Sequence, residues 1–220
     1  MGTTVAGRVA GALLGHACGD ALGSTTEFLN AAEVRRRWPQ GHRDLTGGGL
    51  LSWRPGQGTD DTDLTWAVAA AYIDGYSLRS AAERMLAWYE TRPPDIGNTT
   101  AAALAAYKAD RNPRTSGVAA AQSPMGAGNG SLMRALPTAL VRPNAEQRAT
   151  EAGELSAVTH ADPRCVDACA AYCDLAAHLI EGADPDDAIG EVLDNSTIGG
   201  ETRTAIIEGA AASPGGPRSP

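Results

Sequence analysis

Apolar residues recur at the spacing of a helix face along most of this chain, and the alternation typical of a half-buried β-strand is nearly absent. Alanine, the strongest helix former, supplies 42 of the 220 residues, whereas aromatic residues make up only 5%. A chain of this length can bury a core without disulfides or a structural metal. The sequence therefore predicts an all-α fold.

Five segments each place their apolar and small residues on one helix face. The stripes are Val5, Val9, Ala12, Leu13, His16 and Ala17; Leu64, Ala67, Val68, Ala71 and Tyr72; Leu78, Ala81, Ala82, Met85, Leu86 and Tyr89; the alanine-rich segment 100–108; and Val166, Cys169, Ala170, Cys173, Ala177 and Ile180. Glycine and proline mark loops at 46–58, 92–98, 111–129 and 182–185. We expect one domain over residues 1–212 and a flexible Ser-, Gly- and Pro-rich tail at 213–220.

Acidic residues outnumber basic ones, with 26 Asp and Glu against 18 Lys and Arg and a net charge of -8. Such a chain has no basic field to attract a phosphate backbone, which argues against nucleic acid as a partner. The basic cluster Arg35–Arg37 is interpreted as a solvated helix face. No apolar run approaches the roughly 20 residues that span a bilayer, and the N-terminus shows no secretion signal. We therefore expect a cytoplasmic monomer without membrane contact.

Four cysteines stand at positions 18, 165, 169 and 173, and the last three share one stripe of a predicted helix. Their spacing is not the Cys-x-x-Cys pairing of zinc sites, and thiols stacked along a helix cannot form disulfides with each other without distorting it. Buried free thiols are the favoured interpretation, with a metal or redox role as the alternative.

Three carboxylates lie within four residues in the segment Thr59–Asp63, directly before an apolar helix. Carboxylates are favoured at a helix N-terminus by the exposed N–H groups and the macrodipole, so an acidic cap is one interpretation. Clustered hydroxyl and carboxylate oxygens are also the ligands that Mg²⁺, Mn²⁺ or Ca²⁺ prefer. These residues alone leave the cap and the metal site open.

A glycine cluster, Gly126-Ala-Gly-Asn-Gly-Ser131, precedes Leu132-Met-Arg134. Successive glycines let backbone N–H groups converge on an anion, whereas a tight turn that needs positive φ accounts for the same run equally well. His160 stands beside a predicted helix start, where its role is either to orient a ligand or to serve the structure.

Five short motifs follow one another along the chain. They are Gly15-His-Ala-Cys-Gly-Asp-Ala-Leu-Gly23 with Glu27-Phe28, Gly58-Thr-Asp-Asp-Thr62, Asp95-Ile-Gly-Asn-Thr99, Gly128-Asn-Gly-Ser-Leu-Met-Arg134 and Thr159-His-Ala-Asp-Pro-Arg164. Each motif is weak alone, but in this order the chain resembles the ADP-ribosylglycohydrolase family from about residue 5 to about residue 212.

The resemblance implies an orthogonal helical bundle with a two-metal Mg²⁺ or Mn²⁺ centre in a cleft. The family's activity would remove ADP-ribose from a modified protein side chain, most often arginine, or from a related compound. On this resemblance, Thr59, Asp60 and Asp61 match the first metal-binding triad. The residues implied to bind the substrate are Asn98, Gly128, Asn129, Gly130, Ser131 and His160.

Glu27 and Asp95 match carboxylates near the metals, and the resemblance implies a catalytic role for them. Hydrolysis at an anomeric carbon builds positive charge on the ribose, and a nearby carboxylate takes a proton from the attacking water. Either carboxylate can do so, and the sequence does not choose between them. Asp20, in the first motif, is expected to support the site.

The family's second metal-binding triad, in a Gly-Gly-Asp-Thr-Asp-Thr motif, finds no match. The nearest string places Glu201 and Arg203 at the acidic positions, and arginine has no acceptor atom to offer a metal. The string also follows His160 closely, so we interpret residues 201–212 as the helix before a missing C-terminal third. Half a ligand set predicts one weakly bound metal, and the alternative to a hydrolase is an impaired ADP-ribose-binding pseudoenzyme.

Overall fold

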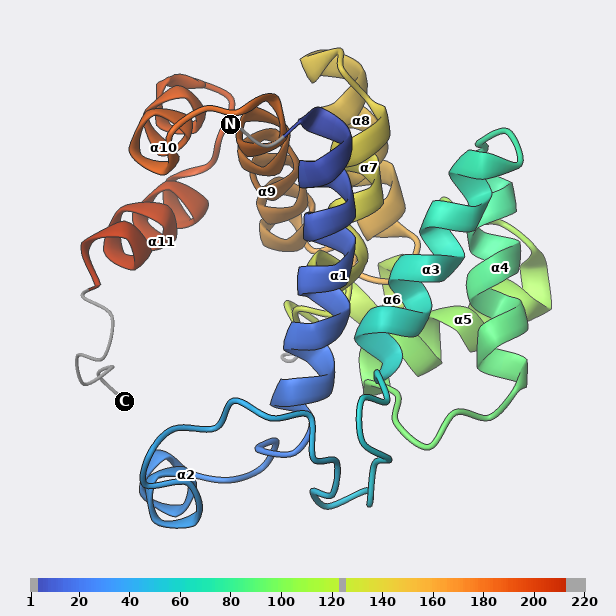
Figure 1. Cartoon of the computed structure of the whole chain (residues 1–220). Helices are drawn as coiled ribbons and strands as arrows, with labels where there is room; N and C mark the ends of the chain where they lie inside the picture. Colours follow the sequence, from blue (N-terminus) through green and yellow to red (C-terminus); the bar gives the residue numbers. More distant parts are fainter. Residues whose placement is uncertain (1–3, 123–125, 213–220) are drawn as a thin grey trace.

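The computed structural model describes residues 4–122 and 126–212, and within those ranges the chain forms helices and no β-strand (Figure 1). The all-α fold predicted from the sequence is therefore confirmed. The elements are α1 (Val5–Gly23), α2 (Ala31–Arg37), α3 (Asp60–Ile73), α4 (Leu78–Glu90), α5 (Asn98–Asp110), α6 (Val118–Ala121), the 3-10 helix η1 (Leu132–Arg134), α7 (Leu136–Val141), α8 (Ala145–Ala157), α9 (Pro163–Glu181), α10 (Pro185–Asp194) and α11 (Gly200–Ala211).

Local sequence signals set where the helices begin and end. The Asn30 side chain accepts a hydrogen bond from the backbone N–H of Glu33, and the Glu33 carboxylate accepts one from the backbone N–H of Asn30. This reciprocal capping box starts α2. Asp162 caps α9 ahead of Pro163, and Gly182 ends that helix in the left-handed conformation that glycine favours.

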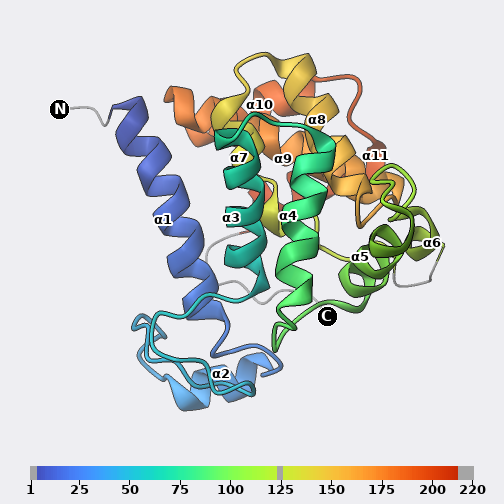
Figure 2. The same cartoon turned by 90° about the vertical axis from the view of Figure 1, so that its right-hand side faces the viewer.

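The largest buried apolar cluster lies where α3, α4, α5 and α8 meet. Leu64 and Val68 of α3 belong to it with Met85 and Leu86 of α4, and all four side chains are almost fully buried. Figure 2 shows α3 and α4 side by side, and these two helices pack along each other. This core holds α3, whose first turn carries the acidic cluster predicted from the sequence.

A second core forms where α7, α8 and α9 meet, and it includes Cys169 and Cys173. The three cysteines of α9 are buried free thiols, as the sequence predicts, whereas Cys18 on α1 is exposed. The contacts run from Cys165 Sγ to Gly128 O at 3.3 Å, from Cys169 Sγ to Ser131 Oγ at 3.5 Å and from Cys173 Sγ to Ala135 O at 3.3 Å. The glycine cluster therefore packs against the cysteine stripe of α9.

Helix α1 contacts α3 and α9 but leaves much of its surface open. Glycine recurs at every fourth position from Gly7 to Gly23. A Cβ added at Gly11 or Gly15 would meet no atom of the described residues within 4 Å. On the same helix, Leu14 is 66% exposed. The open side of α1 is therefore lined largely by glycine.

The last two helices lie beside α9, away from α3 and α4 (Figure 1). Arg203 of α11 donates hydrogen bonds to the backbone oxygens of Leu193 and Asn195 at the end of α10. Glu201 is exposed and lies 3.9 Å from the guanidinium of Arg164. Neither side chain lines the cavity described below, which fits the interpretation of 201–212 as a helix outside the metal motif.

Several elements differ from those predicted. The sequence pattern predicts no helix at α7, α8 or α10, and α6 lies inside the predicted loop 111–129. The predicted tail at 213–220 lies outside the described residues, and the domain boundary at 212 stays a prediction. Among residues 4–122 and 126–212, no helix combines the length and the apolar character needed to cross a lipid bilayer.

Candidate functional site

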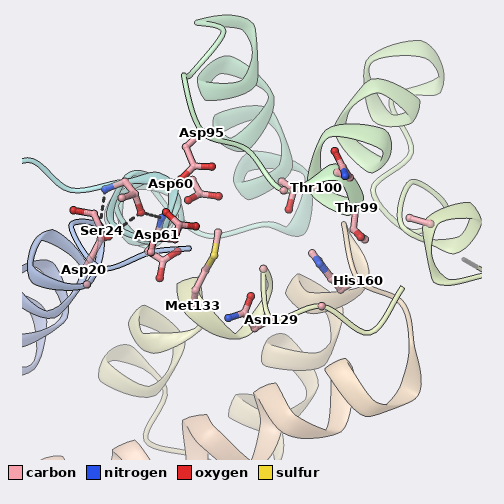
Figure 3. Close-up of a pocket in the computed structure, with 18 of the residues that line it drawn as sticks. Asp20, Ser24, Asp60, Asp61, Asp95, Thr99, Thr100, Asn129, Met133 and His160 are labelled. Carbon is pink, nitrogen blue, oxygen red and sulfur yellow. Dashed lines mark hydrogen bonds between the residues drawn. The ribbon is translucent and has the colours of Figure 1, made fainter. Parts of the chain in front are cut away.

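A cavity of about 860 Å³ opens between the end of α1, the first turns of α3 and α5, and the segment 128–133 (Figure 3). It brings together residues that are far apart in the sequence. Its lining comprises Gly19, Asp20, Gly23, Ser24, Glu27, Thr59, Asp60, Asp61, Asp95, Gly97, Asn98, Thr99, Thr100, Ala102, Ala120, Gly128, Asn129, Gly130, Met133 and His160.

Two sides of this cavity differ in chemistry. Figure 3 shows Asp60, Asp61 and Asp95 gathered on one side, which we call the acidic side together with Glu27. His160 lies across the cavity, near Thr100 and the segment 128–130. We call this second group the glycine-loop side. The cavity therefore sets carboxylates opposite neutral polar groups and backbone.

Asp20 of α1 holds the start of α3. Its carboxylate accepts hydrogen bonds from the Thr59 N–H and hydroxyl, both at 2.7 Å, and from the Thr62 N–H at 3.2 Å and hydroxyl at 2.5 Å. Gly58 allows this approach, since a Cβ there would lie 2.7 Å from the Thr62 side chain and 3.0 Å from Asp20 Oδ2. Asp20 thus occupies the supporting position expected from the sequence, with both of its oxygens already in use.

Every carboxyl group on the acidic side has its pKa raised. Burial is the main cause for Asp60, and repulsion from Asp95 and Asp61 adds to it, so the pKa of Asp60 reaches about 7. Burial also raises the pKa of Asp61, Asp95 and Glu27, and neighbouring carboxylates raise it further in each case. The acidic side therefore holds more negative charge than the surrounding protein neutralises.

The glycine-loop side depends on the missing side chain at Gly130. A Cβ at this position would lie 2.8 Å from His160 Cε1 and 3.0 Å from Thr100 Oγ1. A Cβ at Gly128 would lie 3.5 Å from His160 Nε2. The backbone of the loop therefore comes this close to the histidine because position 130 is glycine, whereas a Cβ at position 128 would make an ordinary van der Waals contact.

His160 is 2% exposed, and burial together with the nearby positive charge of Arg134 lowers its pKa to about 4, which favours the neutral imidazole. Its Nδ1 lies 2.8 Å from the Thr159 hydroxyl, while its other nitrogen, Nε2, faces the cavity (Figure 3). A neutral imidazole has one donor and one acceptor nitrogen, so it can offer a ligand either role.

Helix α5 directs its first turn into the cavity. Its N-cap residue is Gly97, which has no side chain to cap the first turn. Asn98, Thr99 and Thr100 line the cavity. Backbone N–H groups at a helix start carry partial positive charge and favour anions. Thr100 is not among the site residues predicted from the sequence, although its position two residues after Asn98 was an available signal.

The structure brings almost all of the predicted site residues to this cavity. Ser131 is the exception, because it is buried behind the loop and its hydroxyl accepts a hydrogen bond from the Ser156 hydroxyl at 2.8 Å. A side-chain contact from Ser131 to a ligand is therefore not supported by its position. The serine instead supports the loop from behind.

The oxygens of the acidic side are of the kind that a hard divalent cation prefers, and burial together with repulsion between neighbouring carboxylates raises the pKa of Asp60 and Asp61. Thr59, Asp60 and Asp61 supply such donors from one helix start. Among the described residues, however, no three His, Cys, Asp or Glu side chains come together closely enough to hold a metal ion. The described residues thus supply oxygen donors of the right kind without a complete ligand set.

This chain belongs to the ADP-ribosylglycohydrolase family, whose family model matches residues 1–217. It is 39% identical over 141 residues to the ADP-ribosyl-[dinitrogen reductase] glycohydrolase of Rhodospirillum rubrum, an alignment that covers 63% of this chain and 46% of that protein. It is 33% identical over 199 residues to the ADP-ribosylarginine hydrolase Tri1 of Pseudomonas putida, covering 84% of this chain and 50% of that protein.

A solved structure named as an ADP-ribosylglycohydrolase-related protein complex shares the fold. It aligns with a TM-score of 0.79 and 28% identity, covering 94% of this chain and 68% of that chain. The chain spans about half the length of the curated relatives it matches. The family resemblance read from the five motifs is therefore confirmed.

Proposed function

We propose that this chain binds ADP-ribose in the cavity and acts as a hydrolase of arginine-linked ADP-ribose. The observation that carries the proposal is the pairing of an acidic side with a glycine-loop side in one cavity. A diphosphate needs N–H donors and close backbone approach, which the glycine-loop side and the start of α5 offer. A ribose whose anomeric carbon becomes positive needs carboxylates, which the acidic side offers.

In this proposal Glu27 or Asp95 accepts the proton of the attacking water. The water oxygen bonds to the anomeric carbon, the bond to the guanidine nitrogen breaks, and the leaving guanidine gains a proton. Both carboxylates line the cavity, and burial together with repulsion from neighbouring carboxylates raises the pKa of each above its ordinary value, the direction that makes a carboxylate a better proton acceptor. The names of two curated relatives, which act on ADP-ribosylated dinitrogen reductase and ADP-ribosylarginine, support the substrate class.

We also propose that Mg²⁺ or Mn²⁺ binds on the acidic side, held by Thr59, Asp60 and Asp61. Such an ion supplies positive charge that orients ribose hydroxyls and makes water more acidic. One observation favours a second function, binding of ADP-ribose without efficient turnover. The described residues do not complete a set of three carboxylate or imidazole ligands, so the ion would be weakly held.

Release of ADP-ribose from ADP-ribosyl-arginine at saturating Mn²⁺ separates these functions. We expect slow release that is abolished in Asp61→Ala and kept in Asp44→Ala, whose exposed side chain lies outside the cavity. Binding of ADP-ribose without release would select the second function. A folded chain that neither binds nor releases ADP-ribose would contradict both.

A further inference from the structure

Arg134 is buried behind the glycine-loop side and has no carboxylate partner among the described residues. It is 1% exposed. Its guanidinium donates to Gly130 O at 2.6 Å, to Leu155 O at 3.0 Å and to Thr159 Oγ1 at 2.7 Å. Burying a charge without an ion pair is costly, so a purely stabilising role accounts poorly for this arginine.

The Thr159 hydroxyl connects Arg134 to His160. It is fully buried, it accepts from the guanidinium, and its oxygen lies 2.8 Å from His160 Nδ1. A guanidinium can only donate, so the hydroxyl hydrogen must go elsewhere. The imidazole nitrogen is its one available acceptor among the described residues. A buried hydroxyl hydrogen without an acceptor would be unfavourable, so the hydroxyl donates to Nδ1.

This direction of the hydrogen bond fixes the tautomer of the ring. When Nδ1 accepts, the proton of the neutral imidazole resides on Nε2. Nε2 faces the cavity and has no hydrogen-bond partner among the described residues. It is also the ring nitrogen nearest the loop, since a Cβ at Gly130 would lie 3.1 Å from it.

We propose that Arg134 and Thr159 are positioning residues that hold His160 as a neutral Nε2–H donor toward an acceptor oxygen of the bound ligand. Arg134 also donates a hydrogen bond to the Gly130 carbonyl. One buried side chain therefore positions both the loop backbone at Gly130 and, through Thr159, the His160 ring. The inference rests on the proposed function for the identity of the ligand, which is ADP-ribose. The tautomer itself follows from the hydrogen-bond geometry alone.

The first test is nitrogen NMR of the imidazole rings in the ligand-free 220-residue chain. The chain has four histidines, and His160→Gln identifies the signals of His160. We expect a single Nε2–H tautomer for His160. In Thr159→Val the Nδ1 signal should move to the position of a nitrogen without a hydrogen bond, and in Thr159→Ser it should stay. A protonated Nδ1 in the unsubstituted chain would overturn the proposal.

The second test is calorimetric titration with ADP-ribose. Thr159→Val, or Thr159→Ala if the valine variant does not fold, should bind about tenfold more weakly, the effect of one lost hydrogen bond. Thr159→Ser should restore the affinity. Thr138→Val is the matched control, because it removes a fully buried hydroxyl that is hydrogen-bonded to Tyr72 outside the cavity.

The two tests separate this proposal from the proposed function. Unchanged ADP-ribose affinity in folded Thr159→Val would overturn the positioning role. If the unsubstituted chain binds no ADP-ribose while His160 shows the expected tautomer and the expected shift in Thr159→Val, the proposed ligand is wrong and the hydrogen-bond relay stands.

Discussion

At the scale of single residues, the acidic side of the cavity is the feature with the clearest energetic consequence. Asp60 lies among like charges, and its pKa of about 7 means that ionising it costs folding free energy at neutral pH. We expect Asp60→Asn to raise the melting temperature by about 3 °C at pH 8 without divalent metal, since about 1 kcal/mol shifts a chain of this size by 2–4 °C. Thermal unfolding followed by circular dichroism measures it, with Asp44→Asn as the exposed control.

The same substitution has a pH dependence whose sign follows from the raised pKa. A carboxyl group with a folded-state pKa above its unfolded value stabilises the protein at low pH, and that contribution is lost as the pH rises through about 7. The difference in melting temperature between Asp60→Asn and the unsubstituted chain should therefore widen from pH 5.5 to pH 8. A constant difference would show that the pKa of Asp60 is not raised in the folded chain.

If Asp60 is a metal ligand, divalent metal should make the unsubstituted chain melt at a higher temperature than Asp60→Asn. Binding to the folded state alone raises stability with metal concentration, so Mn²⁺ should raise the melting temperature of the unsubstituted chain. The melting temperature of Asp60→Asn should rise less with Mn²⁺, because this variant has lost a ligand and one of the clustered negative charges that attract the ion. Equal gains in both proteins would refute the metal assignment.

Single residues also show what sequence reasoning could reach. Asp60, Asp61 and His160 were assigned to one site because their motifs occur in the family's order, and the structure brings them to one cavity. The position of Ser131 behind the loop was not predictable, because it depends on Ser156 from another helix. Neither was the burial of Arg134, since nothing in the sequence tells which arginine lacks an acidic partner.

At the scale of elements, α1 stands out because glycine occupies an open helix face. Glycine in a helix interior costs about 0.5–1 kcal/mol relative to alanine, and an added Cβ at Gly11 would meet no atom of the described residues within 4 Å. We expect Gly11→Ala to raise the free energy of unfolding by about that amount in a denaturant titration. Gly117→Ala should lower it, because its Cβ would lie 2.2 Å from Ala157 O. A loss of stability in Gly11→Ala would show that this face is covered.

The cysteine stripe of α9 gives a second prediction at this scale. Cys165, Cys169 and Cys173 are buried, and burial raises the pKa of each thiol, to about 11 for Cys165. Thiolate is the reactive form, so these three should resist a water-soluble disulfide reagent in the folded chain. Exposed Cys18 should react, giving one fast thiol per chain and four in denaturant. Fast reaction of two or more thiols in the folded state would contradict the seating of the loop on α9.

Two of the helices not predicted from the sequence, α8 and α10, share a physical cause. In α8 the buried positions include Ala152, Gly153 and Arg148, so few large apolar residues mark its inner face. In α10 only Ala188 and Val192 are buried among the residues of the helix. The periodicity of large apolar side chains is therefore weak in both helices. Their N-cap residues, Asn144 and Asp184, are of types that often begin a helix and could have indicated where each one starts.

At the scale of the whole molecule, the all-α class followed from alanine content and helical periodicity, and the family followed from the order of five motifs. The cavity could not be derived in the same way. It depends on α5 directing its first turn toward a loop 30 residues later, a relation that packing of the α3, α4, α5 and α8 core sets. Motif order predicted which residues meet, while their two-sided arrangement is a finding of the structure.

We propose that the cavity binds ADP-ribose through close backbone approach at Gly130. Calorimetric titration with ADP-ribose in the presence of Mg²⁺ tests it, comparing the unsubstituted chain with Gly130→Ala and with Gly11→Ala as a matched control outside the cavity. We expect one binding site per chain, with affinity unchanged in Gly11→Ala and at least about tenfold weaker in folded Gly130→Ala, whose methyl group would press on His160. Absence of binding by the folded, unsubstituted chain, or equal affinity in Gly130→Ala, would contradict it.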